Sequence, residues 1–158
     1  MHKRLNFIPL FFVFLFVMFT TVPAFSQISR ALAPDELKSI LRNDHPRIFF
    51  NVDSFPAVRT MALGKESKRF EDMKARVDRL DPGSLESKDY GVPAAEAAFV
   101  YLVTDDERYR ILARELLKRS IVYYHECYVN QKPVDWYAYS RICAWAAYDW
   151  IFNSLTRE

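Results

Sequence analysis

Three consecutive acidic side chains, Asp105, Asp106 and Glu107, are the first candidates for chemistry in this chain. Paired carboxylates can act as the acid and the base, or as the acid and the nucleophile, of glycoside hydrolysis. Acids that are adjacent in sequence at the start of a helix are better explained by the positive end of the helix dipole. Thr104 followed three residues later by Glu107 predicts a capping box, with Thr104 as the cap. We therefore interpret these acids as structural.

The histidine and cysteine side chains do not predict a metal site. His45 and His125 show no ligand spacing with each other or with Cys127 and Cys143, and a zinc site needs a set of closely placed ligands. The two cysteines are open to two interpretations, a pair of buried thiols or a disulfide that export would permit. His125, near the end of a predicted helix, is interpreted as a partner of the helix dipole. His45 with Arg47 is interpreted as part of a structural turn.

Residues 1–26 have the pattern of a secretory signal peptide. A basic start is followed by a mostly apolar run, and Ala24 and Ser26 place small residues at positions −3 and −1. Cleavage is therefore expected before Gln27, with a periplasmic or secreted location. The alternative is an uncleaved anchor, but the run reaches the roughly 20 residues needed to cross a membrane only if its prolines and threonines are counted.

Cleavage would remove Lys3 and Arg4 and lower the formal charge from +2 to 0. A chain without net charge has no broad electrostatic field for nucleic acid or anionic lipid. We therefore expect neither a nucleic-acid partner nor a stable membrane anchor after the signal has been removed.

The rest of the chain has helical periodicity throughout, which predicts an all-α fold. Residues 45–52 are expected to be extended, because Pro46 disfavours helix at the residue before it. Gly64 is expected to stop or bend one helix. Helices are predicted over residues 34–41, 55–63, 65–80 with a buried stripe of Phe70, Met73, Val77 and Leu80, 92–103, 105–124 and 136–152.

Two of these helices are nearly free of charge. Residues 92–103 contain a single charged residue, Glu96, so most of this helix must be covered by other elements. The following helix has one apolar side and one basic side, which is typical of an outer helix. Residues 136–152 contain only Arg141 and Asp149 as charges, so this helix is predicted to lie inside a larger helical assembly.

Two motifs carry a resemblance to a known family. The first is His45-Pro46-Arg47-Ile48-Phe49-Phe50-Asn51, followed by a Pro-led helix with Arg59, and the second is Ala146-Ala147-Tyr148-Asp149-Trp150-Ile151-Phe152-Asn153-Ser154-Leu155-Thr156. They resemble the entry to the helical domain of the heparinase II/III-like polysaccharide lyases and the AYDW helix of the same family. Together the motifs bracket residues 45–158.

The resemblance implies that residues 27–158 are the N-terminal portion of an (α/α) toroid of helical hairpins. It also implies an exported lyase that cleaves uronic-acid-containing polysaccharides by β-elimination without a cofactor. The catalytic Asn, His and Tyr residues of that family come from later helices and a β-sandwich, so none is assigned here and the catalytic region is expected beyond residue 158. The alternatives are another toroid glycan enzyme, such as an unsaturated-uronyl hydrolase, and a non-catalytic periplasmic helical-repeat scaffold.

Trp136, Tyr137 and Arg141 are the candidate substrate-binding residues. They lie at the start of the last predicted helix, the kind of end from which a toroid builds its cleft. An Arg can pair with a carboxylate, and an aromatic face can stack on a pyranose ring. The alternative interpretation places the aromatic rings in the core and pairs Arg141 with Asp149.

Overall fold

The structure is a computed structural model that describes residues 34–134 and 139–155. The chain divides into two compact units, residues 1–41 and 42–158, and each is considered by itself. The first unit contains helix α2 (Pro34–Ile40), as predicted. Every regular element of the described residues is helical, which confirms the all-α class. The expected signal peptide and its cleavage site before Gln27 lie outside the described residues.

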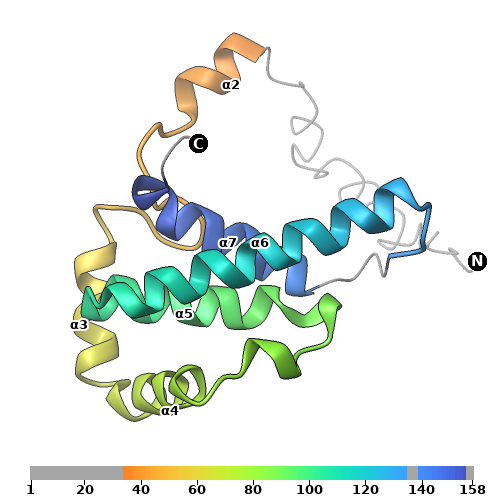
Figure 1. The fold of residues 1–158 in the computed structure, drawn as a ribbon. Coiled ribbons are helices and arrows are strands. Elements are labelled where there is room, and N and C mark those ends of the chain that lie inside the picture. Colours follow the sequence, from red (N-terminus) through yellow and green to blue (C-terminus); the bar gives the residue numbers. More distant parts are fainter. Residues whose placement is uncertain (1–33, 135–138, 156–158) are drawn as a thin grey trace, which may run out of the picture. The chain divides into compact units, whose positions relative to one another are not determined.

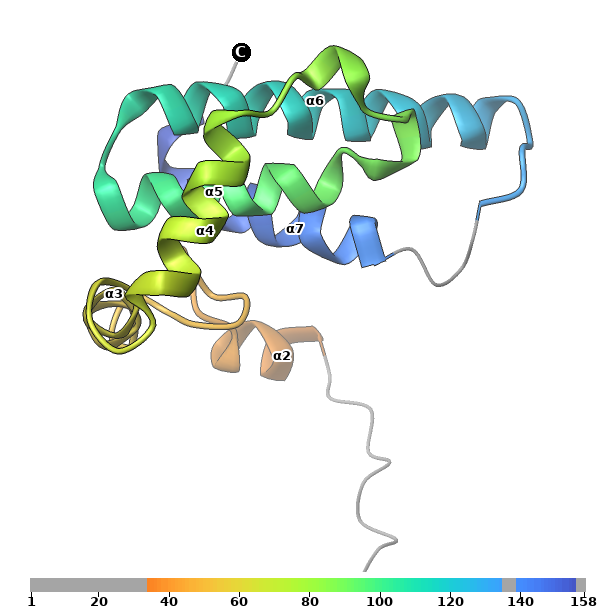
Figure 2. The same cartoon turned by 90° about the horizontal axis from the view of Figure 1, so that it is seen from below.

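The second unit is built around three neighbouring helices, α5 (Gly91–Thr104), α6 (Glu107–Val129) and α7 (Tyr139–Ile151). Figures 1 and 2 show the three helices packed together, with α6 running opposite to α5 and α7. A short α3 (Phe55–Leu63) and α4 (Ser67–Asp78) precede them, and α4 crosses α5. Single-turn 3₁₀ helices complete the unit: η2 (Pro82–Ser84), η3 (Ser87–Asp89) and η4 (Phe152–Ser154).

Helix α5 is the central element because its side chains are small and uncharged on nearly every side. Ala94, Ala97 and Ala98 are completely buried, and Val100 and Val103 are buried beside them. Small side chains let neighbouring helices approach closely, so the predicted covering of this helix is confirmed. The other core residues come from the helices around it, among them Phe70, Val77, Ala113, Leu116, Ala147 and Ile151.

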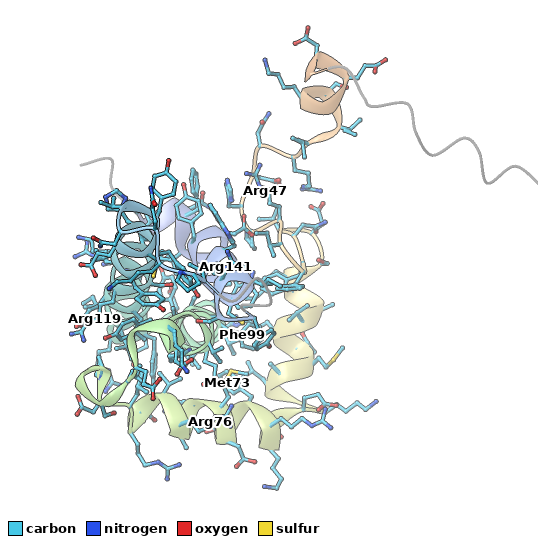
Figure 3. The ribbon with its side chains drawn as sticks, turned by 90° about the vertical axis from the view of Figure 1, so that its right-hand side faces the viewer. Arg47, Met73, Arg76, Phe99, Arg119 and Arg141 are labelled. Atoms are coloured by element: carbon cyan, nitrogen blue, oxygen red, sulfur yellow. The ribbon has the colours of Figure 1, made fainter. Side chains whose placement is uncertain are left out.

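Helix α4 has the predicted buried stripe. Phe70 and Val77 are buried, and Met73 and Leu80 pack against the same core. Figure 3 shows Met73 of α4 close to Phe99 of α5, where the two helices face each other. The helix α3 before it ends at Leu63, with Gly64 as its C-cap, as predicted.

Arg119 of α6 fastens the segment between α4 and α5. Its Nη1 atom donates to the carbonyl oxygen of Pro82 at 3.1 Å, and its guanidinium lies 5.7 Å from the ring centre of Tyr90. Arg119 therefore holds this segment against α6, and Figure 3 shows Arg119 at the edge of that helix.

The predicted capping box is wrong. Thr104 is the last residue of α5, and its hydroxyl donates to the carbonyl oxygen of Val100 at 2.7 Å. Asp105 ends α5 in the left-handed conformation with φ 60°, and Asp106 caps α6 by accepting a hydrogen bond from the backbone N–H of Arg108 at 3.0 Å. The acidic run therefore ends one helix and starts the next. A left-handed residue permits that sharp reversal, since it turns the chain within one position.

Replacing the cap tests this assignment. Asp106→Ala is expected to lower the free energy of unfolding by about 0.5–2 kcal/mol, because the first turn of α6 loses its side-chain acceptor. Glu107→Ala should cost less, since its exposed carboxylate binds Arg110 rather than the cap. Urea unfolding followed by circular dichroism measures both variants, and a larger loss for Glu107→Ala would restore the capping box.

Helix α7 is covered on one side only by the described residues, so the larger helical assembly predicted around residues 136–152 stays a prediction. Its inner side is buried through Cys143, Ala146, Ala147 and Ile151. Its opposite side is open, with Ile142, Trp145 and Tyr148 exposed. An apolar sequence predicts burial but does not say which element covers it, and α5 covers only one side of α7.

Candidate functional site

A buried hydrogen-bonded cluster joins the two sequence motifs. His45 Nδ1 and Asp149 Oδ1 are 2.5 Å apart, although the two residues are 104 positions apart in the chain. Asp149 Oδ2 accepts hydrogen bonds from the backbone N–H groups of Arg47 at 2.7 Å and Ile48 at 2.8 Å. Asp149 is 2% exposed and His45 is 6% exposed. The carboxylate is thus satisfied by three donors in a site with almost no water.

Neighbouring contacts extend this cluster in both directions. Trp150 Nε1 donates to the carbonyl oxygen of Ile48 at 3.0 Å, and Asn153 Nδ2 donates to that of His45 at 3.0 Å. The imidazole of His45 stacks on Phe152 with ring centres 3.8 Å apart. The segment before α3 is therefore tied to the end of α7 through backbone groups on one side and side chains on the other.

Two sequence predictions meet at this cluster. The structural interpretation of His45 is confirmed, since the side chain is buried and bonded to Asp149. The extended conformation expected for residues 45–52 is wrong: the segment is a bent loop in which Phe49 has φ 69°. The loop bends because successive backbone N–H groups turn toward one carboxylate, which an extended strand would not allow.

The predicted pairing of Arg141 with Asp149 is also wrong. Eight residues along an α-helix span about 12 Å, too far for these side chains to meet while the carboxylate faces the interior. The Arg141 guanidinium instead lies 5.6 Å from the ring centre of Tyr124 on α6. Figure 3 places Arg141 on α7, apart from Arg47 on the loop.

A groove between α6 and α7 contains Arg141. Its volume is about 430 Å³. We call it the α6–α7 groove, and it is lined by Leu117, Ser120, Ile121, Tyr124 and His125 of α6 and by Arg141, Ala144, Trp145 and Tyr148 of α7. Trp145 is 65% exposed, and its ring meets that of Tyr148 edge-on at 6.3 Å. The groove thus combines aromatic rings with a guanidinium and an imidazole.

The α7 side of the groove carries the positive charge of Arg141. Burial raises the pKa of Tyr124, with Arg141 opposing the shift, so the phenol stays neutral and its ring faces the guanidinium. A cation over an aromatic face is attracted by the ring quadrupole, which restricts its orientation. Among the described residues, no acidic side chain lines the groove. The arrangement is suited to an anionic group that also presents an apolar face.

Three of the residues singled out from the sequence need separate comment. Trp136 and Tyr137 lie outside the described residues, so Arg141 is the one candidate binding residue that the structure places. His125 is not a partner of the helix end, because α6 continues to Val129. The exposed ring of Trp145, which sequence reasoning had assigned to an inner face, lines the groove; its position one turn after Arg141 was the available signal.

The acidic and sulfur-containing candidates do not form a site. Asp106 binds Arg108 at 2.7 Å, and Glu107 binds Arg110, so the acids of this turn act on their own helix. Cys127 and Cys143 are both buried and free. Among the described residues, no group of three His, Cys, Asp or Glu side chains is placed to hold a metal ion.

Comparison with models of known protein families, with curated proteins and with solved structures finds no match to this chain. None of the described helices is long and apolar enough to cross a membrane.

Proposed function

We propose that this chain is the N-terminal helical part of an exported polysaccharide lyase, and that the α6–α7 groove holds part of its uronic-acid-containing substrate. The observation that carries the proposal is the position of Arg141, whose guanidinium lies over Tyr124 in the same groove as the exposed ring of Trp145. An Arg that faces a carboxylate and a ring that faces a pyranose are the two contacts that an acidic sugar requires.

The packing of the two family-like motifs supports the same proposal. His45 of the first motif and Asp149 of the second form one buried pair, and Trp150 bonds back to Ile48. The residues that carry the resemblance therefore pack together in the fold. Further hairpins of an (α/α) toroid belong to this proposal, as does the supply of the catalytic residues by the rest of the enzyme.

A helical scaffold that binds a protein partner is the second candidate. It is favoured by the largely apolar walls of the α6–α7 groove, which include the exposed side chain of Ile121. An unsaturated-uronyl hydrolase has less support, because its chemistry needs a pair of aspartates and none of the described aspartates lines this groove.

Binding of uronate oligosaccharides to the exported chain tests the proposal. Arg141→Gln is expected to weaken binding by about 10- to 100-fold, which corresponds to the loss of one charge-assisted hydrogen bond. Trp145→Ala should also weaken binding, while neither change should alter the melting temperature by more than about 2 °C, since both side chains lie at the surface. Titration calorimetry at two salt concentrations measures the effect, which should be larger at low salt.

Arg69→Gln is the matched control, because Arg69 lies on α4 with its side chain 86% exposed and lines neither wall of the groove. It should bind the oligosaccharide like the unchanged chain. Equal binding by Arg141→Gln and Arg69→Gln would remove the groove from the proposed substrate site and leave the scaffold as the better candidate.

A further inference from the structure

A second hollow lies on the opposite side of α7 from the α6–α7 groove. The groove uses Arg141, Ala144, Trp145 and Tyr148, whereas the second hollow uses Tyr139, Cys143, Ala146 and Trp150. At about 100° per residue these two sets point in opposite directions from the helix axis. The hollow has a volume of about 330 Å³, and we call it the Phe49 hollow after the residue at its rim. Its other lining residues are Met73, Val92, Ala95, Glu96 and Phe99.

Phe49 is held at this rim in an unusual conformation. Its φ of 69° is rare for a bulky side chain, and its ring is 74% exposed. The preceding peptide is fastened on both sides, since the N–H of Ile48 bonds to Asp149 and its carbonyl accepts from Trp150. Such a conformation persists where its surroundings over-determine it, and it is frequent at ligand sites. The buried cluster therefore holds an aromatic ring over the hollow and exposed to water.

A second exposed ring and one carboxylate complete the lining. Tyr139 is 67% exposed at the start of α7. Glu96 Oε1 accepts a hydrogen bond from Arg76 Nη2 at 2.5 Å, while no described residue donates to Glu96 Oε2. The pair carries no net charge, and burial raises the pKa of Cys143, so its thiol is neutral as well. Figure 3 shows Arg76 on α4 next to Met73, toward the side on which Phe99 lies.

We propose that the Phe49 hollow binds a neutral pyranose ring. Exposed aromatic faces can stack on the C–H face of such a ring, and the open carboxylate oxygen can accept from its hydroxyl groups. Together with Arg76, the described residues of this hollow carry no net charge, which separates it from the α6–α7 groove, where Arg141 favours an anion. A small pocket with apolar walls and a few convergent polar atoms is the usual form of a small-ligand site.

The side chain of another protein is the competing occupant. It would use the apolar walls alone, without the free oxygen of Glu96, so binding would not depend on hydroxyl groups. The proposal does not depend on the lyase assignment, because it is derived from residues on the other side of α7.

Saturation-transfer NMR with the exported chain and methyl glycosides of neutral hexoses tests the proposal, with methyl glucuronide as the charged comparison. Neutral glycosides should receive saturation and should bind at least about tenfold more weakly to Phe49→Asn and to Tyr139→Ala. Asn tolerates positive φ, so Phe49→Asn keeps the loop conformation while it removes the ring. Glu96→Gln should also weaken the binding of neutral glycosides, because the charged acceptor is lost.

Tyr128→Ala is the matched control, because Tyr128 is 82% exposed on α6 and lines neither hollow. It should leave binding unchanged. Arg141→Gln should also leave neutral glycosides bound, which separates this outcome from failure of the proposed uronate site. The proposal is overturned if no neutral glycoside receives saturation at millimolar concentration, or if Phe49→Asn and Tyr139→Ala bind as well as Tyr128→Ala.

Discussion

Asp149→Ala is expected to lower the free energy of unfolding by about 3–5 kcal/mol, the usual cost of removing one partner from a buried pair. The change leaves the imidazole of His45 and the backbone N–H groups of Arg47 and Ile48 without an acceptor at a site that is 2% exposed. Since small domains are stable by only about 5–15 kcal/mol, this loss is a large fraction of the total. Urea unfolding followed by tryptophan fluorescence measures it.

Asp72→Ala is the control for the loss of a carboxylate. Asp72 pairs with Lys68 on the surface of α4, with its side chain 60% exposed, and should change stability by less than about 0.5 kcal/mol. Asp149→Asn keeps an acceptor for the two N–H groups and should fall between the two variants. If Asp149→Ala were as mild as Asp72→Ala, the cluster would not be what fastens the loop to α7.

Gly91→Ala is expected to lower the free energy of unfolding about as much as Asp149→Ala, because the added methyl group has no space. A Cβ at this position would lie 1.8 Å from the carbonyl oxygen of Ser140, where α5 and α7 meet. The close approach is stabilised by a hydrogen bond of 3.0 Å from the N–H of Gly91 to Ser140 Oγ. Overpacking usually costs about 1–3 kcal/mol, and a clash with backbone on two rigid helices should cost at least the upper value.

Gly83→Ala provides the comparison within the same protein. A Cβ there would come 3.2 Å from a carboxylate oxygen of Asp81, an exposed side chain that can move. Its effect should stay below about 1 kcal/mol. Thermal unfolding of both variants measures the difference. Equal melting temperatures would show that α5 and α7 leave room for a Cβ at Gly91.

Helix positions were largely predictable from local sequence, because each depends on residues close to it. The apolar stripe of α4 and the stop at Gly64 follow from side-chain spacing and from the backbone freedom of glycine. The cap of α6 was misplaced by two residues. A local pattern of four polar residues fits more than one cap, and the left-handed turn at Asp105 decides between them.

The candidate site was less predictable, because its contacts are far apart in the sequence. Arg141 was expected either to meet Asp149 or to face a substrate. The pairing with Asp149 is wrong, and the sequence did not indicate the contact of the guanidinium with Tyr124 of another helix. Nothing in the sequence around Asp149 indicates that its partner is His45, 104 residues earlier. Both motifs were visible, but their contact was not.

By itself, the sequence determined that the chain is helical, where its helices lie and that α5 must be covered, since periodicity and charge act over a few residues. Only the tertiary structure decided which side of α7 is exposed, that Phe49 is held over a hollow and that Asp149 binds the loop before α3. The physical reason is that a buried carboxylate must accept hydrogen bonds from donors that the packing of the unit places next to it. That packing depends on side-chain shape across the whole unit rather than on neighbours in the chain.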